Sequence, residues 1–474
     1  MPVSISLQRP GLVALISLSS ALVASQLFSS LSTSQASMGI LAVFFVTVSF
    51  SLIRVKDHQV HNKDDSESRA RINQMRSDSI TANTTKPALK SGPLNIVVVG
   101  AGLIGPRHAQ HVNDNDSTML FAIIDLNPST KVVAQNLNTN YFSSIEEMIE
   151  YCTMNGLKLP DGAIICTPNH THVPVAAKLA SFGINLLVEK PVSPTAEESK
   201  ALKIYSNFKK VKVLVGHHRR FNPFIIATKK NLYKIGSVVA IQGTWALKKH
   251  EDYFKTSPWR TNSETGGGTL LINLVHDLDL LQYLFGPIYQ VYAESLPKKR
   301  GYEKVDEGAA LTLRFKSGAC GTFICSDNVP SPFNFESSTG ENPTVPLHDN
   351  LHGLYRIFGS NGTLSIPDFN LYQNHPELSE SNTWLNEIRS KRIVDPKVLM
   401  KQKPFDSQLN HFVNIINDNH IPNCNIDDGI SALLVIQSVQ KSLQTGLPQV
   451  IPDITDIKPD FISLGLDLDS EWLS

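Results

Sequence analysis

The chain has 474 residues, of which 41% are hydrophobic and 18% are charged. Lys and Arg total 43 and Asp and Glu total 43, so the chain lacks the basic excess that is typical of nucleic-acid-binding domains. Its 27 Gly and 27 Pro are too few for a fibrous protein. Its five Cys show no Cys-x-x-Cys spacing, which argues against a disulfide scaffold and fits a reducing compartment.

The first 53 residues are apolar and carry one charge, Arg9. They contain two apolar stretches, 11–31 and 38–53; the first is diluted by serines and the second is shorter than the roughly 20 residues that span a bilayer. Three interpretations stay open. Residues 11–53 form a membrane anchor that holds the following, basic part in the cytoplasm, or a cleaved secretory signal, or a soluble, dispensable or targeting tail. Residues 54–93 are polar and of mixed charge, which predicts a disordered linker.

The folded part is expected to begin at Leu94. Residues 94–99 are apolar and rich in β-branched side chains, which predicts a buried parallel strand. The loop Gly100-Ala101-Gly102-Leu103-Ile104-Gly105 follows, then a helix over 106–113 and a strand over 120–124 that ends in Asp125. This order of strand, glycine loop, helix, strand and acid is typical of a dinucleotide-binding unit.

Each position of this unit has a physical role in binding a dinucleotide. Gly100 permits a tight turn, Gly102 lets the backbone approach a pyrophosphate, and Gly105 lets the helix pack closely, with its N-terminus favouring the negative charge. Asp125 is expected to accept hydrogen bonds from the adenosine ribose and to repel a 2′-phosphate. The sequence therefore favours NAD, with NADP as the alternative. A glycine turn in an unrelated domain and a helix cap at Asp125 are the competing interpretations.

Helices and strands continue to alternate with short connections. Helices are expected at 143–152, 173–182 and 194–208, and strands at 162–166, 185–188 and 211–215. This alternation predicts an α/β domain with a doubly wound parallel sheet, whose ligands lie beyond the carboxyl ends of the strands. The residues expected there, beside the cofactor, are Thr167, Pro168, Asn169, His172, Glu189 and Lys190.

Three further motifs join these. They are the segment 216–223 (Gly-His-His-Arg-Arg-Phe-Asn-Pro), Gly266-Gly267-Gly268, and His276-Asp277-Leu278-Asp279. Together with Glu189-Lys190-Pro191, they make residues 94–450 resemble the Gfo/Idh/MocA oxidoreductase family.

The resemblance implies hydride transfer between NAD(P) and a sugar, cyclitol or related polyol, which needs no metal. It also implies a second, α+β domain with an open, mainly antiparallel sheet that often forms the interface of a homo-oligomer. The expected organisation is a Rossmann-type domain over 94–220, a substrate domain with closing helices over 221–455, and a C-terminal tail over 456–474.

By position, Lys190 looks like the family's active-site lysine. An ammonium beside the reacting oxygen stabilises its developing negative charge, and Glu189 would orient the lysine or modulate its pKa. A solvated charge at a strand end is the alternative for Lys190.

The helix that carries His276 departs from the family pattern. Many relatives have an aspartate four residues before this histidine, where the chain has Ile272 beside Asn273. Either His276 acts alone as the general base, or Asn273 and His276 only bind substrate. Asp279 follows on the same helical face and is expected to orient the imidazole. A core histidine remains the alternative.

The second domain offers more substrate candidates. His218 and Arg219 lie at the crossover between the domains, where they either line the pocket or hold the domains together. Trp259 and Arg260, with Tyr253, belong to a loop expected over the site. Residues 330–350 are rich in Pro and Ser and form either a binding loop or an insertion. Strands are expected at 238–245, 289–294, 309–315 and 319–325, and helices at 224–232, 269–284, 405–419 and 427–443.

The sequence thus predicts an NAD-dependent oxidoreductase that acts on CH–OH groups of a small polyol, with Lys190 and His276 as catalytic residues. One alternative is a cofactor-binding sensor or scaffold without catalysis. A second is a dihydrodiol- or biliverdin-type reductase of the same family, which would favour NADPH.

Overall fold

The computed structural model describes residues 92–348, 353–374, 384–418 and 420–466. The apolar tail 1–53, nearly all of the linker, and the end of the C-terminal tail lie outside these ranges, so the expectations about them stay predictions. Within the described part of the chain, no helix is both long and apolar enough to cross a membrane.

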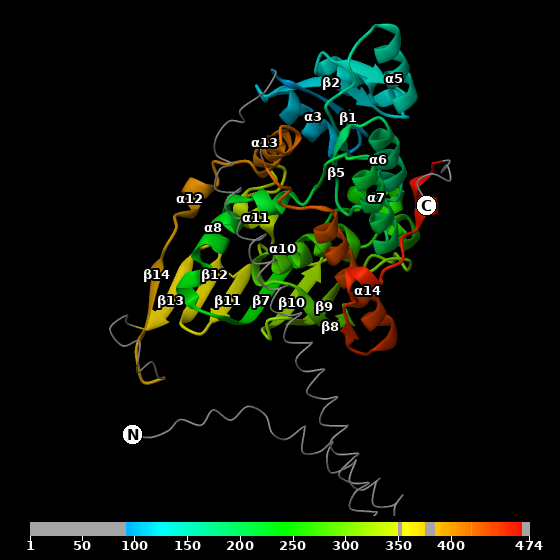
Figure 1. The fold of residues 1–474 in the computed structure, drawn as a ribbon. Coiled ribbons are helices and arrows are strands. Elements are labelled where there is room, and N and C mark those ends of the chain that lie inside the picture. The colour runs from blue at the N-terminus through cyan, green and yellow to red at the C-terminus, as the bar shows by residue number, and fades with distance from the viewer. Residues whose placement is uncertain (1–91, 349–352, 375–383, 419, 467–474) are drawn as a thin grey trace, which may run out of the picture. The chain divides into compact units, whose positions relative to one another are not determined.

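The first domain is built on a parallel sheet. In the described residues it has six strands in the order β3-β2-β1-β4-β5-β6, so the predicted doubly wound sheet is confirmed (Figure 1). Ile96, Val97 and Val98 of β1 are completely buried, as expected for a strand covered on both faces. The strands are β1 (Leu94–Val99), β2 (Thr118–Ile124), β3 (Asn140–Phe142), β4 (Gly162–Ile165), β5 (Asn185–Val188) and β6 (Val213–Val215).

Helices connect these strands and begin at side-chain caps where the sequence supplies them. The Ser144 hydroxyl accepts the Glu147 N–H, and the Thr195 hydroxyl accepts the Glu198 N–H, so α5 and α7 begin with one free N–H group satisfied in each case. The helices are α3 (Gly105–Asn113), α4 (Lys131–Asn136), α5 (Ile145–Met154), α6 (His172–Ser181) and α7 (Ala196–Phe208).

The second domain contains a mixed sheet. In the described residues it has nine strands in the order β14-β13-β12-β11-β7-β10-β9-β8-β15; β7 and β10 pair in parallel and the other neighbours are antiparallel. Sequence analysis missed its last five strands. The strands are β7 (Val238–Ala246), β8 (Ile288–Ser295), β9 (Gly308–Phe315), β10 (Cys320–Ser326), β11 (Tyr355–Gly359), β12 (Gly362–Ile366), β13 (Asn370–Asn374), β14 (Ile388–Arg392) and β15 (Gln449–Val450).

The last two long helices of the chain, α13 and α14, link the two domains. α14 packs on β8 and α10 of the second domain and also on α7 of the first. α13 contributes Leu409, Phe412 and Val413 to the core of the first domain, although the sequence places it with the second (Figure 1). The helices are α8 (Pro223–Asn231), α9 (Glu251–Lys255), α10 (Val275–Phe285), α11 (Phe335–Thr339), α12 (Pro396–Leu399), α13 (Pro404–Ile416) and α14 (Ile426–Thr445).

The predicted helix over 269–284 is present, but it opens with a π-helical turn that the sequence analysis did not anticipate. Residues Leu270–Leu274 form a π-helical turn, and α10 begins only at Val275. Asp306 accounts for this start, because its Oδ1 accepts the Leu270 N–H at 2.9 Å. Its Oδ2 also lies so close to Gly268 that a Cβ there would be only 2.4 Å away, so this position, with a φ of +100°, requires glycine. A wider turn of this kind often occurs at functional sites.

Arg220 is buried at the crossover and ties the two domains together. Its guanidinium bonds both carboxylate oxygens of Asp279 at 2.8 and 2.5 Å, and it donates to the Asn423 carbonyl at 2.7 Å. Asp279 is 1% exposed, so it has no solvent to stabilise its charge if the arginine is removed.

We therefore expect Arg220→Met to destabilise the protein by about 3–5 kcal/mol, because it leaves an uncompensated buried carboxylate. The control is Lys203→Met, which breaks an ion pair with Asp427 that is more than one-third exposed on both sides and should cost at most about 1 kcal/mol. Urea denaturation of the full-length protein measures both changes. Equal stabilities for the two variants would contradict this account of the crossover.

Candidate functional site

The glycine loop has the geometry of a dinucleotide cradle. A Cβ on Gly100, whose φ is +92°, would lie 2.8 Å from the Cys166 carbonyl, and one on Gly105 would lie 1.9 Å from the Gly100 oxygen. A Cβ on Gly102 would meet no atom within 4 Å. The outer glycines are therefore required by packing, whereas Gly102 leaves open space before the N-terminus of α3, as the predicted approach of a pyrophosphate requires.

Asp125 lies at the carboxyl end of β2, beside this loop. Its Oδ2 accepts the Ala101 N–H at 2.6 Å and its Oδ1 accepts the Asn127 N–H at 2.8 Å. Asn127, rather than Asp125, caps the short helix that follows, by accepting the Ser129 N–H. Asp125 thus holds the loop in place and remains partly exposed, where a ribose hydroxyl can reach it.

Residues at the ends of β4 and β5 connect the first domain to the second. The Asn169 side chain donates to the Gly266 carbonyl at 3.3 Å, which places the loop before the π-helical turn beside the loop 167–169. His172 is 1% exposed, and its two ring nitrogens lie 2.8 Å from the Thr167 and Pro191 carbonyls. The His172 ring therefore holds two loops together instead of facing open space.

Lys190 reaches from the first domain to the second. Its Nζ donates to the Ile272 carbonyl, in the π-helical turn, at 3.0 Å. Burial lowers the pKa of this ammonium to about 8, although the nearby Glu189 carboxylate raises it in part. Lys190 keeps part of its surface exposed, so a ligand can contact it.

Glu189 is locked behind Lys190. Its Oε1 lies 2.8 Å from His108 Nε2 and its Oε2 accepts the Lys190 N–H at 3.1 Å, while a Cβ on Gly216 would lie 2.9 Å from the Glu189 Cα. Burial opposes its ionisation, but the hydrogen bond and charge of His108, together with Lys190, lower its pKa to about 2. His108 escaped sequence analysis, although its place one turn into the helix after the glycine loop marks it as close to the cofactor.

His276 lies in a cluster of rings and cations. Its ring contacts those of His218 and His217, with centroids 5.2 and 5.9 Å apart. Burial, followed by the charges of Lys190 and Arg219, lowers its pKa well below the usual range. Its Nδ1 is buried and has no hydrogen-bond partner among the described residues. The lowered pKa favours the neutral form of the His276 imidazole.

The expected pairing of Asp279 with His276 is absent. The Asp279 carboxylate is bound to Arg220 and lies 3.7 Å from His217 Nδ1, so its charge stabilises the crossover. Asp277, the residue after His276, accepts a hydrogen bond from the Tyr355 hydroxyl at its Oδ1 at 2.5 Å, and burial raises its pKa to about 7. Neither acid orients His276.

Arg219 holds the segment 330–350 onto the crossover. Its guanidinium lies 2.8 Å from Glu341, 2.9 Å from Glu336 and 3.4 Å from Asp277, and the residue is 2% exposed. Glu336 belongs to α11, so the described part of this segment is packed, and whether it is a binding loop or an insertion stays a prediction. Of the alternatives for Arg219, the geometry favours holding the domains together over lining a pocket.

The loop after β7 supplies a second lysine that sequence analysis missed. Lys249 Nζ donates to the Asn273 Oδ1 at 2.6 Å and lies 4.4 Å from the centre of the Tyr253 ring. The Arg260 guanidinium lies 3.9 Å from the same ring. Trp259 is only partly buried. The pair Lys248-Lys249 at a strand end was the signal available in the sequence.

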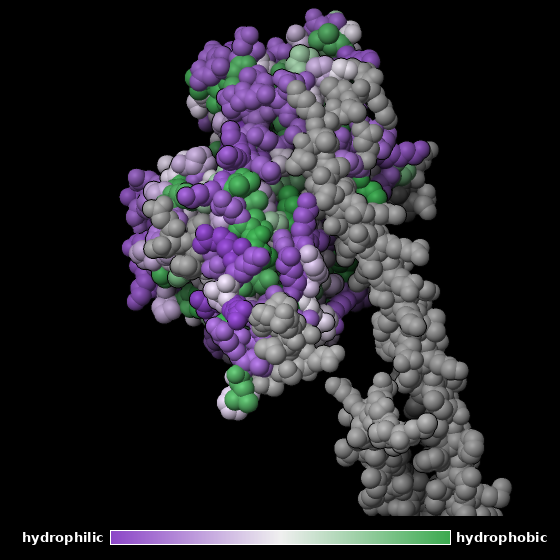
Figure 2. Space-filling view, turned by 90° about the vertical axis from the view of Figure 1, so that its left-hand side faces the viewer, coloured by the Kyte–Doolittle hydropathy of each residue, from purple (hydrophilic) through white to green (hydrophobic). Residues whose placement is uncertain are grey.

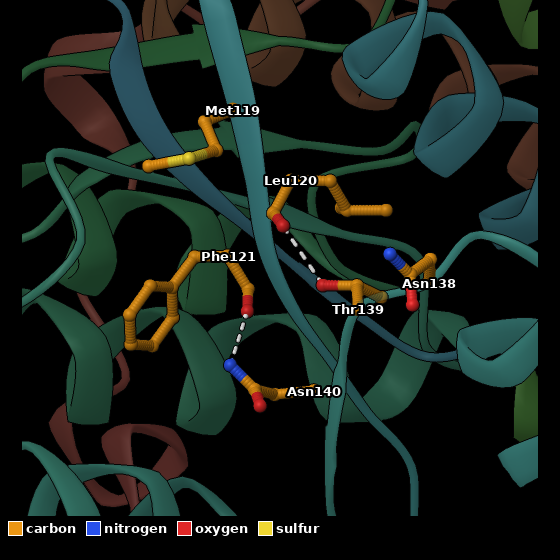
Figure 3. A pocket seen from close by; sticks show the side chains of 6 residues that line it. All are labelled: Met119, Leu120, Phe121, Asn138, Thr139 and Asn140. Atoms are coloured by element: carbon orange, nitrogen blue, oxygen red, sulfur yellow. Dashed lines mark hydrogen bonds between the residues drawn. The ribbon is translucent and has the colours of Figure 1, made fainter.

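A surface cavity of about 370 Å³ lies elsewhere, against β2 and β3 (Figure 3). Two of its polar side chains are already bonded: Thr139 donates to the Leu120 carbonyl and Asn140 to the Phe121 carbonyl. Leu120 and Phe121 belong to the amino-terminal half of β2, whereas Asp125 follows its carboxyl end. This cavity is therefore not part of the candidate site.

Comparisons with known proteins agree with this arrangement. Residues 94–217 match the model "Oxidoreductase family, NAD-binding Rossmann fold" and residues 229–450 match "Oxidoreductase family, C-terminal alpha/beta domain", both of GFO_IDH_MocA. The chain belongs to the Gfo/Idh/MocA family.

Two named dehydrogenases are similar to this Gfo/Idh/MocA member in sequence, and a third is similar in fold. Inositol 2-dehydrogenase of Rhizobium meliloti is 30% identical over 197 residues, which cover 40% of this chain and 54% of that protein; the chain thus matches about half the length of that relative. Levoglucosan dehydrogenase of Pseudarthrobacter phenanthrenivorans is 28% identical over 298 residues, 60% of this chain and 75% of that protein. The fold resembles the WlbA dehydrogenase of Bordetella pertussis in complex with NADH and UDP-GlcNAcA, with a TM-score of 0.59, 20% identity, and coverage of 76% and 99% of the two chains.

Asp125 gives a direct test of the cradle. We expect Asp125→Ser to weaken NADH binding about 10-fold, because a charge-assisted hydrogen bond contributes about 1.5–3 kcal/mol. The same change should strengthen NADPH binding, because it removes a charge that repels the 2′-phosphate. Titration calorimetry measures both affinities, with Asp114→Ser, at an exposed helix end, as the control. A parallel loss for both cofactors would refute the role of Asp125.

Proposed function

We propose that the chain catalyses NAD-dependent hydride transfer at a CH–OH carbon of a sugar, cyclitol or related polyol. The observation that carries the proposal is the position of Lys190 relative to His276. The Lys190 Nζ donates to the Ile272 carbonyl, in the π-helical turn that directly precedes the helix of His276. The names of the relatives, inositol 2-dehydrogenase and levoglucosan dehydrogenase, support the substrate class.

The cofactor has a fitting place. The backbone of residues 100–105 would hold the pyrophosphate of NAD and Asp125 would hold its ribose, while Thr167, Pro168 and Asn169 border the route to Lys190. NAD, when bound, supplies the acceptor or donor for the hydride. The protein's part is to bind, orient and move the proton.

Lys190 and His276 divide the remaining work. The Lys190 ammonium can exchange the Ile272 carbonyl for the reacting substrate oxygen and stabilise its negative charge as it develops. The neutral His276 can accept the hydroxyl proton during oxidation and return it during reduction. Asn273, whose side chain faces Lys249, and His218 remain substrate-binding candidates.

We also propose that the chain forms a homo-oligomer through the outer face of its second sheet. Large apolar side chains that point outward at exposed positions on that sheet support this: Val239, Tyr289, Ile324, Phe358, Tyr372 and Ile388. Hydrophobic residues are exposed among hydrophilic ones on the side of the molecule that Figure 2 draws. A cytoplasmic location with residues 11–53 as a membrane tether is proposed only from the composition of that tail.

We expect Lys190→Met to lower turnover of a polyol substrate at least about 100-fold, as the loss of one donor to a developing oxyanion does, and to keep NADH binding. Activity of the wild type should fall as the pH rises through about 8, because deprotonation removes the positive charge that stabilises the developing oxyanion.

The measurement is NADH formation over a polyol panel across pH, with the exposed Lys178→Met as the control. Full turnover by Lys190→Met would refute its role. Cofactor binding without turnover of any polyol would favour the non-catalytic sensor, and a preference for NADPH would favour the dihydrodiol- or biliverdin-type reductase.

A further inference from the structure

The candidate site presents two ammonium groups to one turn of the chain. Lys190 donates to the Ile272 carbonyl and Lys249 donates to the Asn273 side chain, and these two partners are consecutive residues. The two cations are close enough for the charge of Lys249 to lower the pKa of Lys190. Both partners are neutral oxygens, so neither ammonium has its charge compensated by this turn.

The acids nearby are already engaged by other cations. Asp327 lies 3.6 Å from Lys249, but its other oxygen bonds Arg300 at 2.5 Å. Among the described residues, Lys190 has no ion pair within 4.0 Å, and Glu189, behind it, is bonded to His108. Burial of positive charge without a matching negative charge is costly, so the arrangement favours a ligand that brings a negative charge.

Arg260 adds a third cation at the same place. It is 6% exposed, and its Nε is buried without a hydrogen-bond partner among the described residues. Its Nη1 donates to the Tyr253 carbonyl at 2.5 Å, and its guanidinium and Lys249 Nζ both lie against the Tyr253 ring. The Tyr253 ring therefore holds Arg260 and Lys249 side by side. Lys249 in turn bonds Asn273, in the turn that Lys190 reaches.

On the opposite side, the charge of Glu336 favours the Lys190 ammonium, but this carboxylate is already paired with Arg219 at 2.9 Å. Burial and the cations Lys190 and Arg219, with His217 and His218, all disfavour a charged His276. A neutral sugar would bring no negative charge to the ammonium groups. An anionic substrate would do so, and hydrogen bonds between charged groups are stronger than those between neutral groups. We therefore expect the site to favour anionic over neutral substrates.

We propose that the substrate is an acidic sugar or polyol whose carboxylate is bound by Lys249, with Arg260 beside it, while Lys190 holds the reacting oxygen. This rests on the proposed function and adds the charge of the substrate to it. A carboxylate is favoured over a phosphate because few donors are free: Lys249 already serves Asn273, and Arg260 already serves Tyr253.

The test compares sugars that differ in the group at C6: a neutral hydroxymethyl group, a carboxylate or a phosphate ester. The full-length protein is incubated with NAD⁺ and either glucose or glucuronate, galactose or galacturonate, and glucose 6-phosphate, and kcat/KM is measured for each. We expect the uronates to exceed their neutral partners by about 10- to 100-fold, as one charge-assisted hydrogen bond allows. Equal or higher values for the neutral sugars would overturn the inference and leave the proposed function intact, and a preference for the phosphate would overturn the carboxylate.

Variants then assign the effect to Lys249. Lys249→Met should reduce the ratio of uronate to neutral-sugar kcat/KM toward one, mainly through KM, and Lys249→Arg should restore much of it. Lys248→Met, exposed and one residue away, is the matched control and should keep the ratio. If Lys249→Met does not fold, Lys249→Gln, which can still donate to Asn273, replaces it. An unchanged ratio in the folded variant would exclude Lys249.

A binding measurement separates the two proposals. If neither these sugars nor any member of the polyol panel is turned over, the proposed function fails, and glucuronate is titrated by calorimetry into the NADH-loaded wild type and Lys249→Met. Binding to the wild type that the variant loses would still support the acid site. Equal heats for both proteins would overturn it.

Discussion

The hydrogen bond from the Lys190 ammonium to the Ile272 carbonyl joins the two domains at the site, and the rest of the arrangement supports it. On one side, His108 and Gly216 fix Glu189, which in turn fixes the backbone of Lys190. On the other side, Asp306 sets the start of the π-helical turn that presents Ile272. Each support comes from a different element, so the position of the ammonium depends on the packing of both domains.

The distribution of charge follows from the same packing. The buried acids near the crossover serve as partners for arginines: Asp279 binds Arg220, and Glu341 binds Arg219. They stabilise the contact between the domains and leave the site itself with ammonium groups and a neutral His276. These acids therefore stabilise the structure and do not take part in the proposed chemistry. The site differs in this respect from one in which an acid is paired with the catalytic histidine.

Much of the first domain could be predicted because its signals are local. Continuous β-branched runs such as 94–99 mark buried parallel strands, and the order of strand, glycine loop, helix and strand marks the nucleotide-binding type of domain. The π-helical turn could not be predicted, because the acid that shapes it lies 36 residues away from Leu270. β14 was missed because all five of its residues are exposed, which removes the apolar alternation. The spacing between His276 and Asp279 indicated a shared helical face, but Arg220, from a distant segment, binds the acid.

The most direct test of this account is the pH dependence of kcat/KM for Glu189→Gln beside that of the wild type. The negative charge of Glu189 favours the Lys190 ammonium, so its removal should move the fall in activity to a pH below about 8. An unchanged profile, or a fall at higher pH, would contradict the claim that the charge state of Lys190, supported by Glu189, controls the reaction.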